Sequence, residues 1–532
     1  MTFSTLKAIT PGLAALGGIA LLIGGAFAGL IAEGFGNLPA AIGAFDSWLF
    51  RIARFTLWQA LLSTLLSVAP AILVARALSR HPAFAGRALI LRLFALPLAL
   101  PAIVAALGIL ALLGRAGLIA PLWGPGWPGI YGLSGILIAH VFFNLPLATR
   151  LLLEALETVP ADQWRLAAQL GMNARSTFRL VEWPAMRRAL PGVAGLVFML
   201  CVTSFTIVLT LGGGPRATTL EVAIYQSLRF DFDPARAVAV TTLQIVLTAL
   251  VLAVLARLGA NVAGDANLAV SRRAAVSPRL SETLFNAMVL AVAVVLVLSP
   301  MAATVIYGLK ADLMRLAGEP AVQSATLTSL GLATCSSILC LAMSWSLVAG
   351  RQKLAAARRK SPTSLLERMF DTGAGYVLIV PPIVIGSGWF LLLRNHIDVF
   401  SVAPIMVAAV NAVMAMPFAI RAIRPAFDAA ALRHDKLSAQ LGISGWNRLR
   451  LIDWPVVRRP MATALAFAMA LSLGDLGVIA LFGSDAVQTL PYLLLGRMGS
   501  YRTDDAAGIA LLLGILCLGL MLLADRLGRT AK

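Results

Sequence analysis

The sequence has few charged residues: Asp, Glu, Lys and Arg make up 13% of its 532 residues, whereas hydrophobic residues make up 59%. Charged residues are about a quarter of an ordinary soluble domain. The mean hydropathy is correspondingly high, at +0.88. A water-soluble globular protein is therefore excluded, and the apolar runs of about 20 residues are long enough to cross a bilayer as helices.

The sequence also lacks the residue patterns that catalysis needs. It contains no Gly-Lys dipeptide, which excludes a phosphate-binding loop of the Gly-x4-Gly-Lys-Ser/Thr type. There is no Cys-x-x-Cys and no His-rich tract, so neither a disulfide framework nor a zinc site is predicted. The triplet Gly212-Gly213-Gly214 is interpreted as a tight turn, because no lysine follows it. We therefore expect a protein that is not an enzyme and holds no cofactor or metal.

Twelve apolar runs are long enough to span a bilayer, so the predicted fold class is an all-α polytopic membrane protein. The expected spans are residues 12–32, 56–76, 89–113, 130–153, 189–211, 238–258, 284–307, 326–349, 374–393, 402–424, 461–482 and 506–526.

The basic residues indicate how the chain crosses the membrane. If both termini lie in the cytoplasm, most of the 43 Lys and Arg residues fall in inner segments, as the positive-inside rule predicts. The net charge of +19 is then spread over several short segments rather than gathered on one face, which excludes nucleic acid as a partner. We expect a multi-pass protein with both termini in the cytoplasm.

One segment occurs twice in the chain. Ala168-Gln169-Leu170-Gly171 is followed by Val181-Glu182-Trp183-Pro184, and Ala439-Gln440-Leu441-Gly442 is followed at the same distance by Ile452-Asp453-Trp454-Pro455. Their numbers differ by a constant offset, 442 − 171 = 271, without a gap, and we call residues 165–184 and 436–455 the two repeat segments. The same offset relates other pairs, which are Pro146 and Pro417, Gly212 and Gly483, and Thr218 and Thr489.

The duplication divides the chain into two halves. Residues 1–258 and 284–532 would each carry six spans, with a repeat segment after the fourth, and the polar residues 259–283 would join them in the cytoplasm. An even number of spans means that both halves start on the same side of the membrane. The halves are then parallel repeats, related by an axis along the membrane normal.

Each repeat segment has a predicted local structure. Residues 161–170 favour a short helix, with Pro160 at its first turn and Gly171 as its stop. A second short helix is expected to end before Pro184, and likewise before Pro455, because proline disfavours the helical conformation of the preceding residue. Such a short helix fits a groove in a cytoplasmic partner. The alternative is an amphipathic helix that lies on anionic membrane lipid.

The repeat segments resemble the signature loop of permease subunits in bacterial ABC importers, Glu-Ala-Ala followed by Gly-x9-Ile-x-Leu-Pro. The first copy supplies Arg165, Leu166, Ala167, Gly171 and Pro184, and the second supplies Lys436, Leu437, Ser438, Gly442 and Pro455. The resemblance implies a fused type I permease of the bacterial inner membrane. Its two loops would each dock into one copy of a separate cytoplasmic ATPase. Arg165 and Lys436 replace the family's glutamate and so reverse a charge in both copies.

Further stretches look like the thiamine and thiamine pyrophosphate group of these permeases. They include His140-Val141-Phe142-Phe143-Asn144-Leu145-Pro146, Leu211-Gly212-Gly213-Gly214-Pro215 and Gly499-Ser500-Tyr501-Arg502. The resemblance implies a periplasmic substrate-binding protein as a further partner. Ferric iron is the second substrate class and polyamine the third, and a secondary transporter is the alternative outside this family.

Polar residues inside the expected spans are candidates for the substrate path, because they are costly in a membrane. His140 and Asn144 are four residues apart and share one helix face. Asp475 lies between two glycines, and its carboxylate could attract the cationic ring of thiamine. The alternative is that Asn144 and Asp475 hold helices together through hydrogen bonds.

Overall fold

A computed structural model describes residues 3–124, 127, 129–257, 280–357, 363–373, 375, 380–443 and 445–529. Every regular element within these ranges is a helix, which confirms the all-α fold class. Of the expected linker 259–283, residues 259–279 lie outside the described residues, and residues 280–283 begin a helix.

The α-helices in chain order are α1 (Phe3–Gly36), α2 (Leu38–Gly43), α3 (Ser47–Arg80), α4 (Arg87–Leu93), α5 (Leu96–Ala99), α6 (Ala102–Leu113), α7 (Ala120–Trp123), α8 (Leu133–Glu157), α9 (Ala161–Gln169), α10 (Ala174–Thr177), α11 (Trp183–Val202), α12 (Thr206–Leu211), α13 (Leu220–Arg229), α14 (Pro234–Arg257), α15 (Leu280–Lys310), α16 (Leu313–Gly318), α17 (Pro320–Ala357), α18 (Leu365–Thr372), α19 (Pro382–Leu393), α20 (Ala403–Gln440), α21 (Gly445–Arg448), α22 (Trp454–Leu473), α23 (Gly477–Phe482), α24 (Leu490–Gly499) and α25 (Thr503–Arg529). Two π-helices, η1 (Phe178–Glu182) and η4 (Leu449–Asp453), and one 3-10 helix, η2 (Pro215–Ala217), complete the described set.

Ten helical stretches of the described part are long and apolar enough to cross a membrane. An eleventh candidate is a bent pair, Arg87–Ala99 and Ala102–Leu113, which meet at 109°. The break lies at Leu100, which has extended backbone because Pro101 follows it. The expected span 374–393 contains α19, whose 12 residues are too short to cross a bilayer alone. The expected total of twelve spans therefore stays a prediction.

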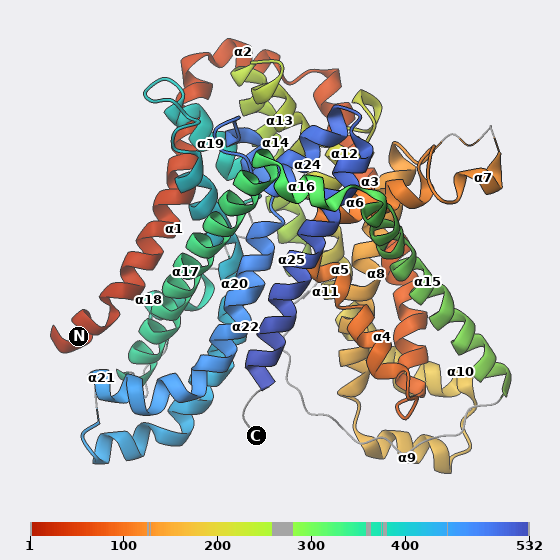
Figure 1. Cartoon of the computed structure of the whole chain (residues 1–532). Helices are drawn as coiled ribbons and strands as arrows, with labels where there is room; N and C mark the ends of the chain where they lie inside the picture. The colour runs from red at the N-terminus through yellow and green to blue at the C-terminus, as the bar shows by residue number, and fades with distance from the viewer. Residues whose placement is uncertain are drawn as a thin grey trace. The chain divides into compact units, whose positions relative to one another are not determined.

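The helices pack into two compact units. One comprises Met1–Phe45, Ala223–Ile245 and Ala311–Lys532, and the other comprises Asp46–Val222 and Val246–Lys310. Helices α3, α8 and α11 pack against one another in the unit that contains Asp46–Val222. Helices α17, α20 and α22 do the same in the unit that contains Ala311–Lys532 (Figure 1). Equivalent helices of the two predicted halves thus build the same three-helix core.

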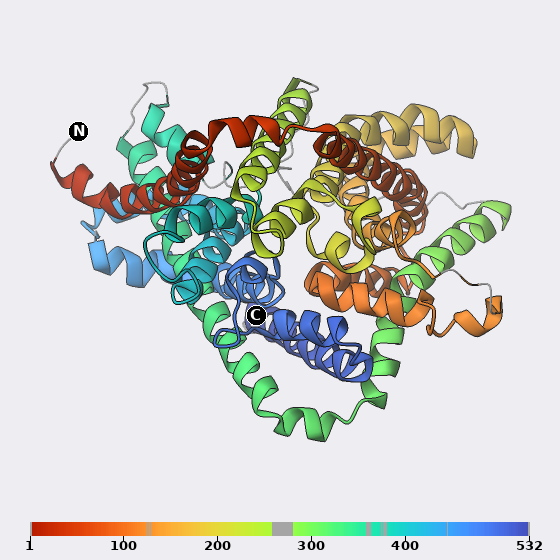
Figure 2. The ribbon, with the colours of Figure 1, turned by 90° about the horizontal axis from the view of Figure 1, so that it is seen from above.

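The first helix of each predicted half packs against helices of the other half. Helix α1 lies against α17 and α19, and α15 lies against α3 and α6. Figure 2 shows the red α1 beside the teal α19. Glycines allow this close approach: a Cβ on Gly29 would overlap the carbonyl of Gly388, and one on Gly108 would overlap Thr304. The compact units therefore differ from the sequence halves 1–258 and 284–532, whose bounds remain a prediction about the repeat.

A buried joint occurs in both compact units and supports the repeat. The backbone N–H of Leu220, at the start of α13, donates to Thr56 Oγ1 at 3.1 Å. The backbone N–H of Leu490, at the start of α24, donates to Ser329 Oγ at 2.8 Å. The hydroxyl on the long helix thus satisfies an N–H group that the first turn of a helix leaves free.

Candidate functional site

The first repeat segment begins in a separate short helix, as expected. Helix α9 covers Ala161–Gln169, and Pro160 directly precedes it. In the second copy the corresponding residues belong to the end of the long helix α20. The chain has Ala431 where the first copy has Pro160, so no proline interrupts the second helix.

Both repeat segments turn at their glycine in the same way. Gly171 has φ +58° and Gly442 has φ +65°, the left-handed conformation that favours glycine. Beyond the first glycine, the Met172 N–H donates to the Ala167 carbonyl at 3.0 Å, and Ile443 makes the equivalent 2.9 Å bond to Ser438. This six-to-one hydrogen bond is the mark of a Schellman helix end. The predicted helix stop at Gly171 is therefore confirmed.

The helix ends before the two glycines leave leucines exposed on the side opposite the core. Leu166 and Leu170 are 54% and 63% exposed, whereas Ala167 is buried beside Trp164. The second copy repeats this pattern with Leu437 and Leu441 exposed and Ser438 buried. Ala167 thus packs inward, whereas Leu166 and Leu170 remain open to a partner.

The two basic residues at the motif's glutamate position lie on these helices. Arg165 is exposed and pairs with Asp162 one turn earlier, with Nη1 and Oδ1 3.2 Å apart. Lys436 lies in the last turns of α20, and its side chain is outside the described part. An exposed pair of this kind contributes little stability, so the Arg165 guanidinium is available to a partner.

The expected helix end before each motif proline is wrong. Residues 174–202 form one continuous helical candidate span, and Pro184 lies in the first turn of α11. The preceding turn is a π-helix in both copies, η1 and η4. The Trp183 N–H donates five residues back, to the Phe178 carbonyl, and the wider turn accommodates a proline that has no N–H of its own. Pro455 follows η4 in the same manner.

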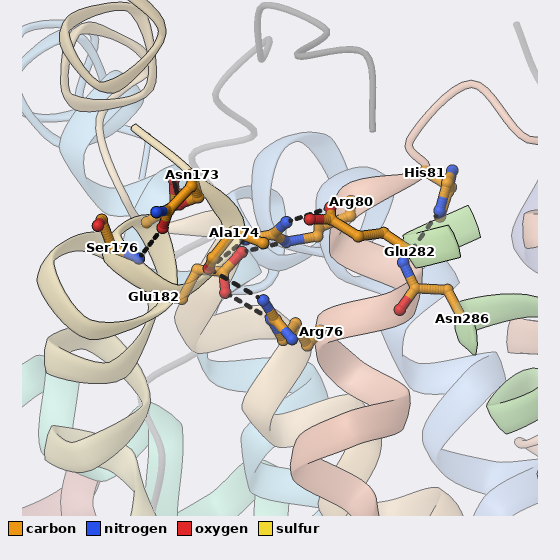
Figure 3. A network of polar contacts seen from close by, with 10 residues as sticks. Arg76, Arg80, His81, Asn173, Ala174, Ser176, Glu182, Glu282 and Asn286 are labelled. Carbon is orange, nitrogen blue, oxygen red and sulfur yellow. Dashed lines mark hydrogen bonds and ion pairs between the residues drawn. The ribbon is translucent and has the colours of Figure 1, made fainter. Parts of the chain in front are cut away.

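The first repeat segment is fixed to α3 by a buried carboxylate. The Glu182 side chain is fully buried, and its two oxygens lie 2.8 Å from Nε of Arg76 and 2.8 Å from Nε of Arg80 (Figure 3). Both guanidinium groups also donate to the Ala174 carbonyl, at 3.1 and 3.3 Å. Buried ion pairs with further hydrogen bonds hold one geometry, so the segment and α3 are expected to move as one body.

The same network reaches α15. Arg80 Nη1 lies 3.2 Å from a Glu282 carboxylate oxygen, and the Asn286 amide lies 3.2 Å from His81 Nε2 (Figure 3). Figure 3 shows these contacts side by side along the end of α3. The first repeat segment is thus linked through α3 to the helix that begins the second half.

The second repeat segment is held mainly by its own residues. Arg448 of α21 pairs with Asp435 at the end of α20 and with Asp453 of η4, the latter at 3.5 Å. Asp453 corresponds to Glu182 by the constant offset of the repeat. Lys353 of α17 attracts Asp453 from beyond ion-pair distance. Within the described part, no arginine of a helix outside the segment forms an ion pair with this copy.

The predicted path residues His140 and Asn144 lie in the core of α3, α8 and α11. Both are buried; His140 Nδ1 is 2.8 Å from Ser63 Oγ, and the Asn144 amide donates to Cys201 Sγ at 3.3 Å. The Gln59 amide donates to the Cys201 carbonyl at 2.8 Å. His140 Nε2 and Gln59 Oε1 are buried without a hydrogen-bond partner. The cluster therefore contains two buried polar atoms whose hydrogen-bonding capacity the described side chains leave unused.

Asp475 lies in the other compact unit, where α22 ends and α23 begins. Its Oδ1 accepts a hydrogen bond from the Gly477 N–H at 3.1 Å, Oδ2 is buried, and the Asn411 side chain and the N–H groups of Val478 and Ile479 lie near the carboxyl group. The Asn411 amide donates to Ser472 Oγ at 3.1 Å beside it. By the constant offset, Asn411 corresponds to His140, Ser472 to Cys201 and Asp475 to Ser204.

Comparison with known proteins identifies the family. The model of the "binding-protein-dependent transport system inner membrane component" family matches the chain twice, at residues 67–264 and 342–530. The chain belongs to this family. Its two matches cover most of the sequence and place one repeat segment in each, so the permease component is present in two fused copies.

Curated relatives match this permease over nearly its whole length. It is 59% identical over 531 residues to the thiamine transport system permease protein ThiP of Brucella abortus, an alignment that covers 99% of this chain and 96% of that protein. The protein of the same name from Salmonella typhimurium is 43% identical over 492 residues, 92% of this chain and 91% of that protein. The molybdenum transport system permease protein ModB of Mycobacterium bovis is 32% identical over 163 residues, 30% of this chain and 61% of that protein.

Sequence reasoning missed several polar residues of this family member's interior. Asn411 and Ser472 could have been found, because the constant offset maps them onto His140 and Cys201. Gln59 and Ser63 carry no such signal, because only the packing of α3 on α8 and α11 brings them to the cluster. Glu182 was visible inside the motif, but its partners on α3 were not.

Proposed function

We propose that the chain is the transmembrane permease of an ATP-driven ABC importer for thiamine or thiamine pyrophosphate. The observation that carries this proposal is the 59% identity, over almost both full lengths, to a thiamine transport system permease protein. The substrate would be delivered on the periplasmic side by a substrate-binding protein. The permease would span the bacterial inner membrane, in contact with membrane lipid, and the binding protein would dock on its periplasmic side.

The two repeat segments would couple transport to ATP hydrolysis in a separate subunit. Each presents a glycine-ended helix with two exposed leucines, at Leu166 and Leu170 and at Leu437 and Leu441. Apolar anchors on a rigid helix end fit a groove on a partner, and two such helix ends suit two ATPase copies. The sequence has no Gly-Lys dipeptide, so the chain would not hydrolyse ATP itself.

We infer a topology of twelve spans in two parallel repeats, with both termini in the cytoplasm. The ten candidates, the bent pair at Leu100 and the short α19 would together make up the twelve. Helices α6 and α19 both begin directly after a proline, Pro101 and Pro381, which supports their equivalence. Residues 1–258 and 284–532 would form the two halves, and residues 259–283 a cytoplasmic linker.

The substrate path would use polar groups from both three-helix cores. His140 and Asn144 would contribute through the unpartnered His140 Nε2, and Asp475 would contribute through its carboxylate. Thiamine carries a cationic ring, and a carboxylate attracts a cation strongly where water is scarce. The broken helices at Ser204 and Asp475 support this location, because transporter sites form where membrane helices are interrupted.

Reconstitution tests the proposal directly. The chain would be placed in proteoliposomes with its ATPase and binding protein, and uptake of radiolabelled thiamine and thiamine pyrophosphate measured with ATP inside. We expect ATP-dependent uptake of at least one of them, which vesicles without the ATPase lack. Ferric iron or a polyamine taken up in their place would overturn the substrate assignment. Uptake driven by an ion gradient without ATP would indicate a secondary transporter.

A further inference from the structure

A cavity of about 360 Å³ lies at the end of α3 that Asp46 caps, away from the repeat segment. Its lining residues come from the first turns of α3 and from the segment before α13, and they are Trp48, Arg51, Ile52, Phe55, Arg216 and Thr218. Ligand pockets begin at about 300 Å³, so a small ligand group fits this one. The lining includes no residue of the polar cluster around His140.

The walls of the cavity are held in place by hydrogen bonds. The bond from the Leu220 N–H to Thr56 Oγ1 fixes the segment before α13 to α3. Gly213 and Gly214, at φ +68° and +125°, turn the chain so that η2 carries Arg216 to the cavity. Thr218 Oγ1 donates to the Gly214 carbonyl at 3.1 Å and closes this turn. The cavity is therefore a product of the fold and not of a loose loop.

Two cationic side chains converge on this cavity without a counter-charge. Arg51 and Arg216 are the charged residues of the lining, which contains no carboxylate. Within the described residues, neither Arg51 nor Arg216 takes part in an ion pair. A guanidinium presents several N–H donors in a planar fork that matches the oxygens of carboxylates and phosphates.

The second half of the chain serves as an internal comparison. It builds the same joint, from Ser329 to Leu490, but the first turns of α17, residues 320–328, contain no basic residue. Val487 stands at the position that corresponds to Arg216. The joint therefore forms without the arginines, so Arg51 and Arg216 are not needed to build it.

We propose that Arg51 and Arg216 form a binding site for a phosphate group. One guanidinium can satisfy a carboxylate bidentately, whereas two around one cavity suit the greater charge and larger number of oxygens of a phosphate. Trp48 and Phe55 give the cavity an aromatic wall for the group that carries the phosphate. That group is either the headgroup of an anionic phospholipid or a soluble phosphate ester or diphosphate.

The first experiment measures binding of a soluble phosphate. Purified full-length chain in neutral detergent, without the ATPase, would be equilibrated with labelled inorganic pyrophosphate at fixed ionic strength. If the source is soluble, Arg51→Gln and Arg216→Gln should each weaken binding by about tenfold, because each removes a charge-assisted hydrogen bond. Arg54→Gln removes the same charge from an exposed residue of α3 outside the lining and should bind like the wild type.

The second experiment tests a lipid source. The chain and the three variants would be incubated with phosphatidylglycerol or phosphatidylcholine, and the lipid retained after delipidation counted by native mass spectrometry. A phospholipid site should retain phosphatidylglycerol in the wild type and in Arg54→Gln and lose it in Arg51→Gln and Arg216→Gln.

The outcomes separate the sources and can overturn the proposal. Arginine-dependent binding of pyrophosphate alone indicates a soluble phosphate, and arginine-dependent retention of lipid alone indicates a headgroup; both together support a site that accepts either. Arginine dependence in neither experiment overturns the site. An equal loss in Arg54→Gln would show general charge attraction, and displacement of pyrophosphate by an equal concentration of acetate would show a carboxylate site instead.

Discussion

Equivalent positions of the two halves carry different polar residues. His140 and Asn411 occupy one such pair of positions, and Ser204 and Asp475 another, both related by the offset of the repeat. Both halves thus keep polar residues at corresponding positions, but only the second half has a carboxylic acid there, at Asp475.

The clearest residue-scale prediction concerns Asp475. Replacement by Asn keeps an oxygen that can accept the Gly477 N–H, but it removes the negative charge. If the carboxylate faces the path, Asp475→Asn should lower uptake of cationic thiamine at least about tenfold. Losing as little as about 1.4 kcal/mol of the attraction between the carboxylate and the cation is enough for a tenfold change. Uptake and the yield of assembled complex would be measured together.

Asp485→Asn is the matched control, because Asp485 is an exposed acid in the loop before α24. It should transport like the wild type. A parallel loss of uptake and complex yield in Asp475→Asn would show that Asp475 holds the fold, and unchanged uptake would remove it from the path.

The glycines that end the two proposed coupling helices support a second prediction. Among the described residues, a Cβ on Gly171 or Gly442 would meet no atom within 4 Å beyond its chain neighbours, so the constraint that the described structure shows is the positive φ. A leucine there costs about 1–2 kcal/mol, whereas Asn tolerates this conformation better. Gly171→Leu and Gly442→Leu should insert normally but uncouple ATP hydrolysis from uptake.

The Asn variants show which cause operates. If the turn alone matters, Gly171→Asn should retain most uptake, and if the partner contacts the glycine closely, Asn should fail as Leu does. ATPase rate and uptake would be measured in the same proteoliposomes. Wild-type uptake in both leucine variants would contradict the coupling role of these helices.

At the scale of elements, the two repeat segments are anchored unequally. Glu182 ties the first segment to α3. The second segment is held mainly by Arg448, which pairs with Asp453 in the segment and with Asp435 just before it. Motion of the first segment should therefore reach the polar cluster around His140 directly through α3, which also carries Gln59 and Ser63. Motion of the second segment should pass mainly along α20, because this continuous helix contains both the start of the segment and Asn411.

Glu182→Gln tests this anchoring. The change leaves two partly buried guanidinium groups without their counter-charge, and breaking one side of a buried ion pair costs about 3–5 kcal/mol. We expect ATP hydrolysis to persist while the uptake per ATP hydrolysed falls several-fold. Asp453→Asn, the equivalent change in the second segment, should have the smaller effect because its ion pair is longer and lies within the segment. Equal ratios of uptake to hydrolysis in both variants would contradict the unequal anchoring.

At the scale of the whole molecule, the fusion of two permease copies predicts the composition of the complex. One chain supplies both coupling helices, so one copy should assemble with two copies of the ATPase. Native mass spectrometry of the purified complex would measure this ratio. Two copies of this chain in the working complex would contradict it, since four coupling helices would then meet two ATPases.

What the sequence by itself determined is local or compositional. The scarcity of charge established the membrane class, and the constant offset between matching residues established the duplication, because both can be counted without knowing any contact. The helix stop at Gly171 could be predicted because it depends on the conformational freedom of a single residue. The helix end expected before Pro184 was wrong, because the helix continues through a π-turn at this proline. That π-turn depends on a few hydrogen bonds between neighbouring residues.

Only the tertiary structure decided which distant residues meet. Glu182 finds Arg76 and Arg80 across 106 and 102 residues, and His140 finds Ser63 across 77. The packing of α1 against α17 and α19 likewise depends on glycines whose role is visible only once the helices touch. In a chain made almost wholly of apolar helices, many pairings satisfy the same hydrophobic pattern. Shape and a few buried polar contacts choose among these pairings, and neither is encoded in a local stretch of sequence.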